Sequence, residues 1–152
     1  MITQPLKNTL ALFAILAGLI SIPLTWMTIQ GAPLPSVTGF PVPIAVNQVK
    51  VTGINGSVTF LFQTPIWILV GIAIFSNVLQ LMQTSRQFAV PPFAEWVTAL
   101  FGFIWIKLGI CVALLSDMIT LGIGSLLGLF CAGVAVFCLV VPTLPDRDSF
   151  LC

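Results

Sequence analysis

The sequence predicts an all-α integral membrane protein, a four-helix transmembrane bundle with an extracytoplasmic β-hairpin loop between the first and second helices. Three observations predict this fold class. Of the 152 residues, 59% are hydrophobic and 6% are charged, whereas an ordinary soluble domain has about 25% charged residues. Four apolar stretches are long enough to cross a hydrocarbon core of about 30 Å. The longest remaining segment contains an Asn-Gly pair between alternating apolar and polar residues, which is typical of a β-hairpin.

Composition also excludes several kinds of function. The chain has no His, which removes His-based metal and haem sites and His-activated nucleophiles. A formal net charge of +1 neutralises few phosphates, so we expect no nucleic-acid partner. The four Cys residues form no Cys-x-x-Cys pair, so we expect no metal site and no cofactor. With no recognisable catalytic residue, the sequence favours a protein that is not an enzyme.

The predicted spans are mostly apolar stretches of about 20 residues. They lie at residues 8–28, 65–82, 94–115 and 121–141. The first span resembles a signal peptide, but its apolar run is longer than a usual signal sequence and Pro33 would follow the cleavage site, so we expect it to be retained. Residues 1–152 then form a single membrane domain, in which residues 30–64 are the one substantial loop.

Basic residues predict the orientation of the chain, because they accumulate on the cytoplasmic side of a membrane. Lys7, Arg86 and Arg147 fall on one side of the predicted spans, and Lys50 falls on the other. We therefore expect both termini in the cytoplasm and the large loop outside it.

The loop hairpin is predicted over residues 49–62, with Asn55-Gly56 as a two-residue turn. This register pairs Ile54 with Ser57 and Thr52 with Thr59, then Val51 with Phe60 and Val49 with Phe62. One face of the hairpin is apolar and consists of Val49, Val51, Val58, Phe60 and Phe62. Because an isolated hairpin is marginally stable in water, this face needs a cover. The cover is either the chain's own helices, the membrane surface, a third strand at residues 44–47, or another protein that pairs with an open strand edge.

Lys107 is the candidate intramembrane charge, because it lies roughly 12 to 14 Å from the predicted outer end of the third span. Glu95 is about 18 Å away along the helix axis and Asp117 about 15 Å away. Either Lys107 binds an anionic substrate, a lipid headgroup or an acidic residue of another subunit, or its side chain reaches the membrane interface from a tilted or shorter helix.

Other polar and small residues predict close packing of the helices. Ser76, Asn77 and Gln80 are expected to join helices by hydrogen bonds. Glu95, near the start of a helix, is expected to complement the helix dipole. Gly124-x-x-x-Gly128 allows close helix approach, either within the bundle or toward a partner.

These features predict a small tetraspan that acts as a scaffold, assembly factor or accessory subunit. Its expected partners are the lipid bilayer and other membrane-protein subunits or copies of itself. The alternative is a small oligomeric transporter or channel for an anionic or lipid-like solute that uses Lys107. The order of a helix, a hairpin and three helices is similar to claudin-like tetraspans in topology only, because their Trp, Gly-Leu-Trp and paired extracellular Cys signature has no match here.

Overall fold

The computed structural model describes residues 2–30, 48–59, 63–84 and 91–142, and most of these are helical. Four helices are each long and apolar enough to cross a membrane. They are α1 (Gln4–Ser21), α2 (Ile66–Thr84), α3 (Pro92–Leu114) and α4 (Ile123–Val140). The prediction of four helices with the length and composition of membrane spans is therefore confirmed, and the last three begin and end within two residues of the predicted positions.

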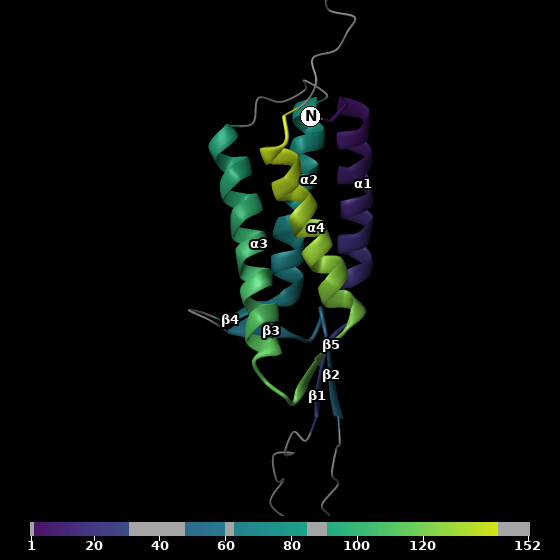
Figure 1. The fold of residues 1–152 in the computed structure, drawn as a ribbon, viewed down its shortest axis with the longest axis vertical. Coiled ribbons are helices and arrows are strands. Elements are labelled where there is room, and N and C mark those ends of the chain that lie inside the picture. The colour runs from purple at the N-terminus through teal and green to yellow at the C-terminus, as the bar shows by residue number, and fades with distance from the viewer. Residues whose placement is uncertain (1, 31–47, 60–62, 85–90, 143–152) are drawn as a thin grey trace, which may run out of the picture.

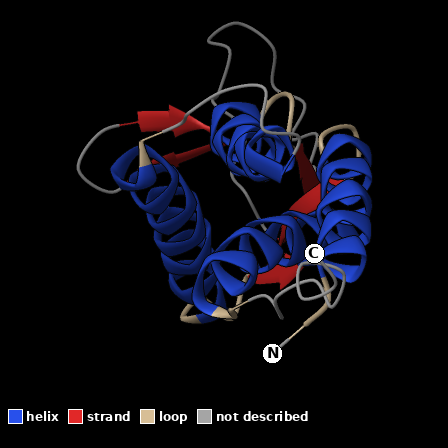
Figure 2. Ribbon diagram, turned by 90° about the horizontal axis from the view of Figure 1, so that it is seen from above, coloured by secondary structure: helices blue, strands red, loops and turns tan. Residues whose placement is uncertain are grey.

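The helices run up and down alongside one another as a bundle (Figure 1). Helix α1 packs against α2 and α4, and α3 packs against the same two helices. Helices α2 and α4 also contact each other across the bundle. Figure 2 shows the four helices viewed from one end of the bundle. The start of α1, the end of α2, the start of α3 and the end of α4 lie together at what we call the terminal end.

Strands lie at the opposite end of the bundle, which we call the sheet end (Figure 1). A three-stranded antiparallel sheet has the order β2-β1-β5 and contains β1 (Thr25–Gln30), β2 (Gln48–Thr52) and β5 (Ile119–Leu121). A two-stranded sheet contains β3 (Ser57–Thr59) and β4 (Gln63–Pro65). The three-stranded sheet thus joins the connection after α1 to the short connection between α3 and α4.

The first predicted span, residues 8–28, is wrong beyond Ser21. Helix α1 ends at Ser21, and residues 25–30 form β1 instead. Pro23 lacks the N–H group that would continue the helical hydrogen bonds. The segment after it is rich in β-branched and aromatic residues, which favour a strand.

The predicted hairpin register is also corrected. Val49 pairs with Ile29 and Val51 with Met27, so β2 pairs with β1, and the described strand after the turn, β3, pairs with β4. Phe60 and Phe62 lie outside the described residues. No third strand can be assessed at residues 44–47, which also lie outside them.

The turn at Asn55-Gly56 is present, but it supports the start of α2 and does not connect two paired strands. The Asn55 side chain accepts a hydrogen bond from the Thr52 backbone N–H at 2.7 Å. The carbonyl groups of Gly53 and Gly56 accept hydrogen bonds from the N–H groups of Trp67 and Ile66. Because the first N–H groups of a helix have no partner within the helix, the turn satisfies the start of α2 rather than closing a hairpin.

Candidate interaction site

Cross-strand pairing divides the three-stranded sheet into two chemically distinct faces. Each row across the sheet contains one residue from each strand, as in Val51–Met27–Leu121, Lys50–Thr28–Thr120 and Val49–Ile29–Ile119. Directly opposed residues point to the same face, and successive rows alternate. The apolar sheet face therefore consists of Met27, Ile29, Val49, Val51, Ile119 and Leu121, and the opposite face is mainly polar.

The apolar sheet face is only partly covered by the described residues. None of its six side chains is fully buried. Val51 packs against the core of the bundle, whereas Val49, in the row farther from the helices, is 38% exposed. Figure 1 shows the sheet extending beyond the ends of the helices. The outer row thus presents apolar side chains on a surface that projects from the bundle.

Both outer strands of this sheet pair only with β1 among the described strands. Gln30 donates its N–H to Met118 and Gly122 donates to Trp26, each at 2.8 Å. Since hydrogen-bonded pairs alternate with non-bonded pairs, the backbone groups of Ile119 and Leu121 point away from β1. The Ile119 N–H donates to the Ser116 carbonyl at 3.2 Å. The Ile119 carbonyl and the backbone groups of Leu121 lie along the outer edge of β5, and such strand edges are able to pair with another strand.

The residues predicted to form one hairpin face lie in two separate places. Val49 and Val51 belong to the apolar sheet face. Val58 instead packs beside α3, where a Cβ atom on Gly109 would lie 3.1 Å from Cγ2 of Val58. No prediction placed Met27, Ile29, Ile119 and Leu121 on an apolar face. The alternation of apolar and polar residues at positions 27–30 and 119–121 is the signal that could have indicated them.

Gly124 and Gly128 face a residue of the same chain. The Trp26 indole lies over both, and a Cβ atom on Gly124 would lie 2.7 Å from Cδ1 of Trp26. Trp26 is 3% exposed, and its Nε1 donates a hydrogen bond to the Ser21 carbonyl at 2.8 Å. The small surface that these two glycines create on α4 is therefore occupied within the chain and is not free for a partner.

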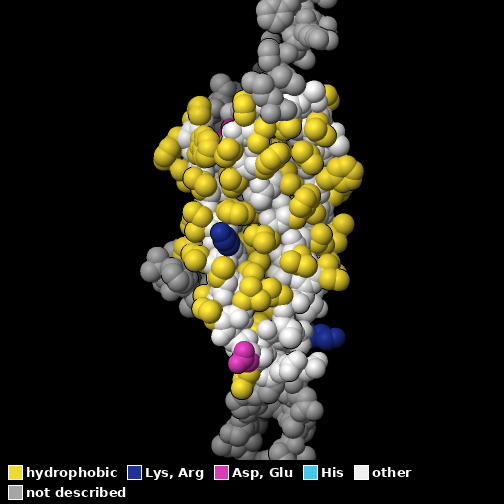
Figure 3. Space-filling view, viewed as in Figure 1, with side chains coloured by type: hydrophobic (Ala, Val, Ile, Leu, Met, Phe, Trp, Pro, Cys, Tyr) yellow, Lys and Arg dark blue, Asp and Glu magenta, His cyan; other side chains and the backbone are white. Residues whose placement is uncertain are grey.

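Lys107 lies on the outer surface of α3 and is exposed. Helix α3 contains one Lys, and Figure 3 shows a dark blue side chain surrounded by hydrophobic ones over this helix. Leu100 and Ile104 are 38% and 49% exposed on the same side of α3. Lys107 therefore does not line the interior of a single bundle.

Buried polar side chains join α2 to α4 in the interior. Asn77 Nδ2 donates to the Cys131 carbonyl at 3.1 Å and to the Ala73 carbonyl at 2.9 Å. Gln80 Nε2 donates to the Ala135 carbonyl at 2.8 Å. These hydrogen bonds agree with the role predicted for the two amides.

Glu95 lies in the first turn of α3, as predicted. It is 4% exposed, and its Oε1 atom has no hydrogen-bond partner among the described residues. A carboxylate at this position complements the helix dipole. The sequence did not predict that the Glu95 side chain is buried against the neighbouring helices.

The cysteines of the described residues are Cys111, which is exposed, and Cys131 and Cys138, which are buried in α4. Within the described ranges, no group of three or more His, Cys, Asp or Glu residues could hold a metal ion. Comparisons with protein-family models, curated proteins and solved structures gave no match. Any argument about function therefore rests on the geometry of this chain.

Proposed function

We propose that the chain is a non-enzymatic multi-pass membrane protein that works by binding other membrane-protein subunits, as a scaffold, assembly factor or accessory subunit. The observation that carries this proposal is the apolar sheet face, which is half-exposed at the end of a bundle whose interior is closely packed. Exposed apolar surface next to an unpaired strand edge is typical of a protein interface.

Lipid does not explain the exposure of this face as well as a protein partner does. The lateral surface of the helices is covered with apolar side chains (Figure 3), as expected for contact with hydrocarbon. The sheet has backbone groups at its edges that need hydrogen-bond partners, and such edges do not face hydrocarbon. A second protein can cover the apolar face and pair with the edge at the same time.

The proposed orientation has the sheet end outside the cytoplasm and the terminal end inside it. Support comes from Lys7, which lies one turn into α1 at the terminal end, and from the excess of basic residues in the segments on that side of the sequence. A reporter enzyme active only in the cytoplasm should be active when fused after Cys152. Its inactivity there would reverse the proposed orientation.

The test of binding compares two adjacent residues of β2 that lie on opposite faces of the sheet. Val49→Lys places a charge on the apolar sheet face, and Gln48→Lys places the same charge on the polar face. We expect the native protein to migrate as a larger assembly in mild detergent, Val49→Lys to reduce that assembly, and Gln48→Lys to leave it intact. Thermal melting checks that both variants fold.

Two results would count against binding through this face. The native protein could migrate as a lone monomer from its own membrane, or Val49→Lys could retain the same assembly as Gln48→Lys. Either result removes the apolar sheet face as the interface.

A further inference from the structure

Four polar side chains are buried together in the half of the bundle nearer the terminal end. We call Ser76, Asn77 and Gln80 of α2 and Glu95 of α3 the polar cluster. Ser76 and Asn77 are 0% exposed, Gln80 is 7% exposed and Glu95 is 4% exposed. Burial of an ionisable side chain within helices that cross a membrane is costly and marks a functional site by default.

The packing of α2 against α3 places Glu95 and Gln80 at the same level. A Cβ atom on Gly102 would lie 3.6 Å from the backbone N of Ala73, so Gly102 and Ala73 lie at the same height along the bundle axis. Glu95 precedes Gly102 by seven residues and Gln80 follows Ala73 by seven. Because the two helices are antiparallel, both steps lead about 10.5 Å toward the terminal end. Asn77 and Ser76 lie about one turn farther inside.

Three side chains of the cluster, those of Ser76, Asn77 and Glu95, offer oxygen atoms that form no hydrogen bond among the described residues. The amide nitrogens of Asn77 and Gln80 donate to carbonyl groups of α4. Since a carboxamide is planar, its oxygen faces away from its nitrogen, so Asn77 Oδ1 turns away from the α4 carbonyl. Asn77 Oδ1, Ser76 Oγ and Glu95 Oε1 have no hydrogen-bond partner in the described part of the chain. Unsatisfied buried acceptors of this kind are costly.

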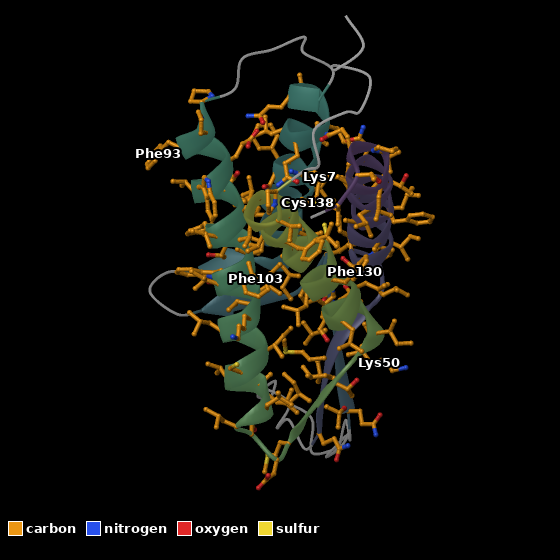
Figure 4. All side chains as sticks on the ribbon, turned by 45° about the horizontal axis from the view of Figure 1, so that its top comes forward. Lys7, Lys50, Phe93, Phe103, Phe130 and Cys138 are labelled. Carbon is orange, nitrogen blue, oxygen red and sulfur yellow. The ribbon has the colours of Figure 1, made fainter. Side chains whose placement is uncertain are left out.

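Few charged or titratable groups face Glu95 from the neighbouring helices. Helix α1 contributes Lys7, whose ammonium group attracts the Glu95 carboxylate without providing a hydrogen bond to Oε1. Helix α4 contributes Cys138, which lies near Lys7 (Figure 4). The buried face of α2 contributes the uncharged polar side chains of the cluster.

We propose that the polar cluster binds a single positive charge, delivered as a proton or as a small alkali cation such as Na⁺. Glu95 is the charged ligand and Asn77 Oδ1 a neutral oxygen ligand. A proton bound to Glu95 forms an O–H group that donates to a neighbouring acceptor. Na⁺ is a hard cation that prefers oxygen ligands. An anion is disfavoured, because acceptor oxygens and a carboxylate repel it.

The proposed site lies near one end of the bundle, so it fits binding of the charge and not conduction across the bundle. Glu95 lies one turn from the start of α3, close to the terminal end. Toward the sheet end, the interior is filled by fully buried apolar side chains, among them Leu69, Val70 and Ile106. The ion or proton therefore exchanges with the solution at the terminal end.

The experiment measures the melting temperature of the purified full-length protein in lipid nanodiscs by Trp fluorescence. One series varies pH, and the other replaces choline by Na⁺ at constant pH and ionic strength. We expect a response to at least one of them, and loss of that response in Glu95→Gln. Asp117→Asn, which neutralises an exposed carboxylate in the connection between α3 and α4, is the matched control and should keep the response.

The two series identify the bound charge. A pH response without a Na⁺ response assigns a proton, and a Na⁺ response at constant pH assigns the alkali ion. The proposal is overturned if the native protein responds to neither, or if Glu95→Gln responds as the native protein does.

A second variant keeps the test decisive if Glu95→Gln does not fold. Lys7→Gln removes the positive charge that competes for Glu95. We expect the midpoint of a pH response to move to higher pH, or the apparent affinity for Na⁺ to rise. An unchanged midpoint and an unchanged Na⁺ affinity would contradict the proposal.

Discussion

The Trp26 indole lies against Gly124 so closely that a Cβ atom on this glycine would lie 2.7 Å from Cδ1 of the ring. The same ring covers Gly128 one turn along α4. Its Nε1 donates to the carbonyl of Ser21, the last residue of α1. One side chain of β1 thus contacts two helices and attaches the three-stranded sheet to the bundle.

Gly128→Ala tests this attachment. The added methyl group would clash with the Trp26 ring, and overpacking of this kind costs about 1 to 3 kcal/mol. Gly71→Ala makes the same substitution in α2, where a Cβ atom would meet nothing within 4 Å, so it should be neutral or stabilise by up to about 1 kcal/mol. Denaturant unfolding in detergent measures both. Equal stabilities of the two variants would contradict the close packing of Trp26.

The helices could be predicted because their signal is local. About 20 consecutive apolar residues are sufficient to indicate a span. The same signal misassigned residues 25–28, because β1 directly continues the apolar run of α1 and a short apolar strand has no distinct periodicity. Pro23 is the residue that separates the two elements.

The sheet could not be predicted from local signals, because its three strands come from distant parts of the chain. Asn55-Gly56 indicated a turn, and a turn is present, but the following strand β3 pairs with β4. No local rule states that β2 returns to β1 or that residues 119–121 join it. The apolar sheet face could therefore be identified only from the strand pairing in the structure.

Engineered disulfides distinguish the observed register from the predicted one. Ile29 and Ile119 form a non-hydrogen-bonded pair, in which Cα atoms are about 4.5 Å apart, and a disulfide tolerates that separation. In a background with Cys111 and Cys152 replaced by Ser, Ile29→Cys/Ile119→Cys should oxidise readily. Thr52→Cys/Thr59→Cys, which the predicted hairpin would bridge, should not. Mass spectrometry of proteolytic fragments identifies the bridge, and the reverse outcome would restore the hairpin.

Asn77 and Ser76 are adjacent buried residues whose substitution by Ala should have different effects on stability. Asn77→Ala removes the hydrogen bond to the Cys131 carbonyl of α4, and bonds of this kind in membrane proteins contribute about 0.6 to 2 kcal/mol. Ser76→Ala removes a hydroxyl oxygen that has no hydrogen-bond partner in the described part of the chain, so it should be neutral or slightly stabilising. Unfolding in detergent at a fixed pH and Na⁺ concentration measures the difference. A larger loss for Ser76→Ala than for Asn77→Ala would be inconsistent with these bonds.

The interpretation of Lys107 depends on where the membrane surface lies along α3. From the sequence alone, Lys107 is well inside a span. In the structure, Gly109 contacts Val58 of the two-stranded sheet, and an open sheet does not face hydrocarbon. Lys107 is two residues, or about 3 Å along the helix, from that level. We therefore expect the ammonium group of Lys107 to reach the membrane interface.

Spin labels along one face of α3 test this depth. In a background without other reactive cysteines, Lys107→Cys is compared with Ile104→Cys and Leu100→Cys, which are exposed on the same side of the helix and lie nearer the middle of α3. We expect the label at residue 107 to be accessible to a water-soluble relaxation agent and the label at residue 100 to be accessible mainly to oxygen, with residue 104 between them. Lys107→Met should then leave the fold intact. If residue 107 shows the oxygen accessibility of residue 100, Lys107 is an intramembrane charge, and the alternative of an oligomeric transporter gains support. In that case, loss of anion flux in vesicles on Lys107→Met becomes the decisive measurement.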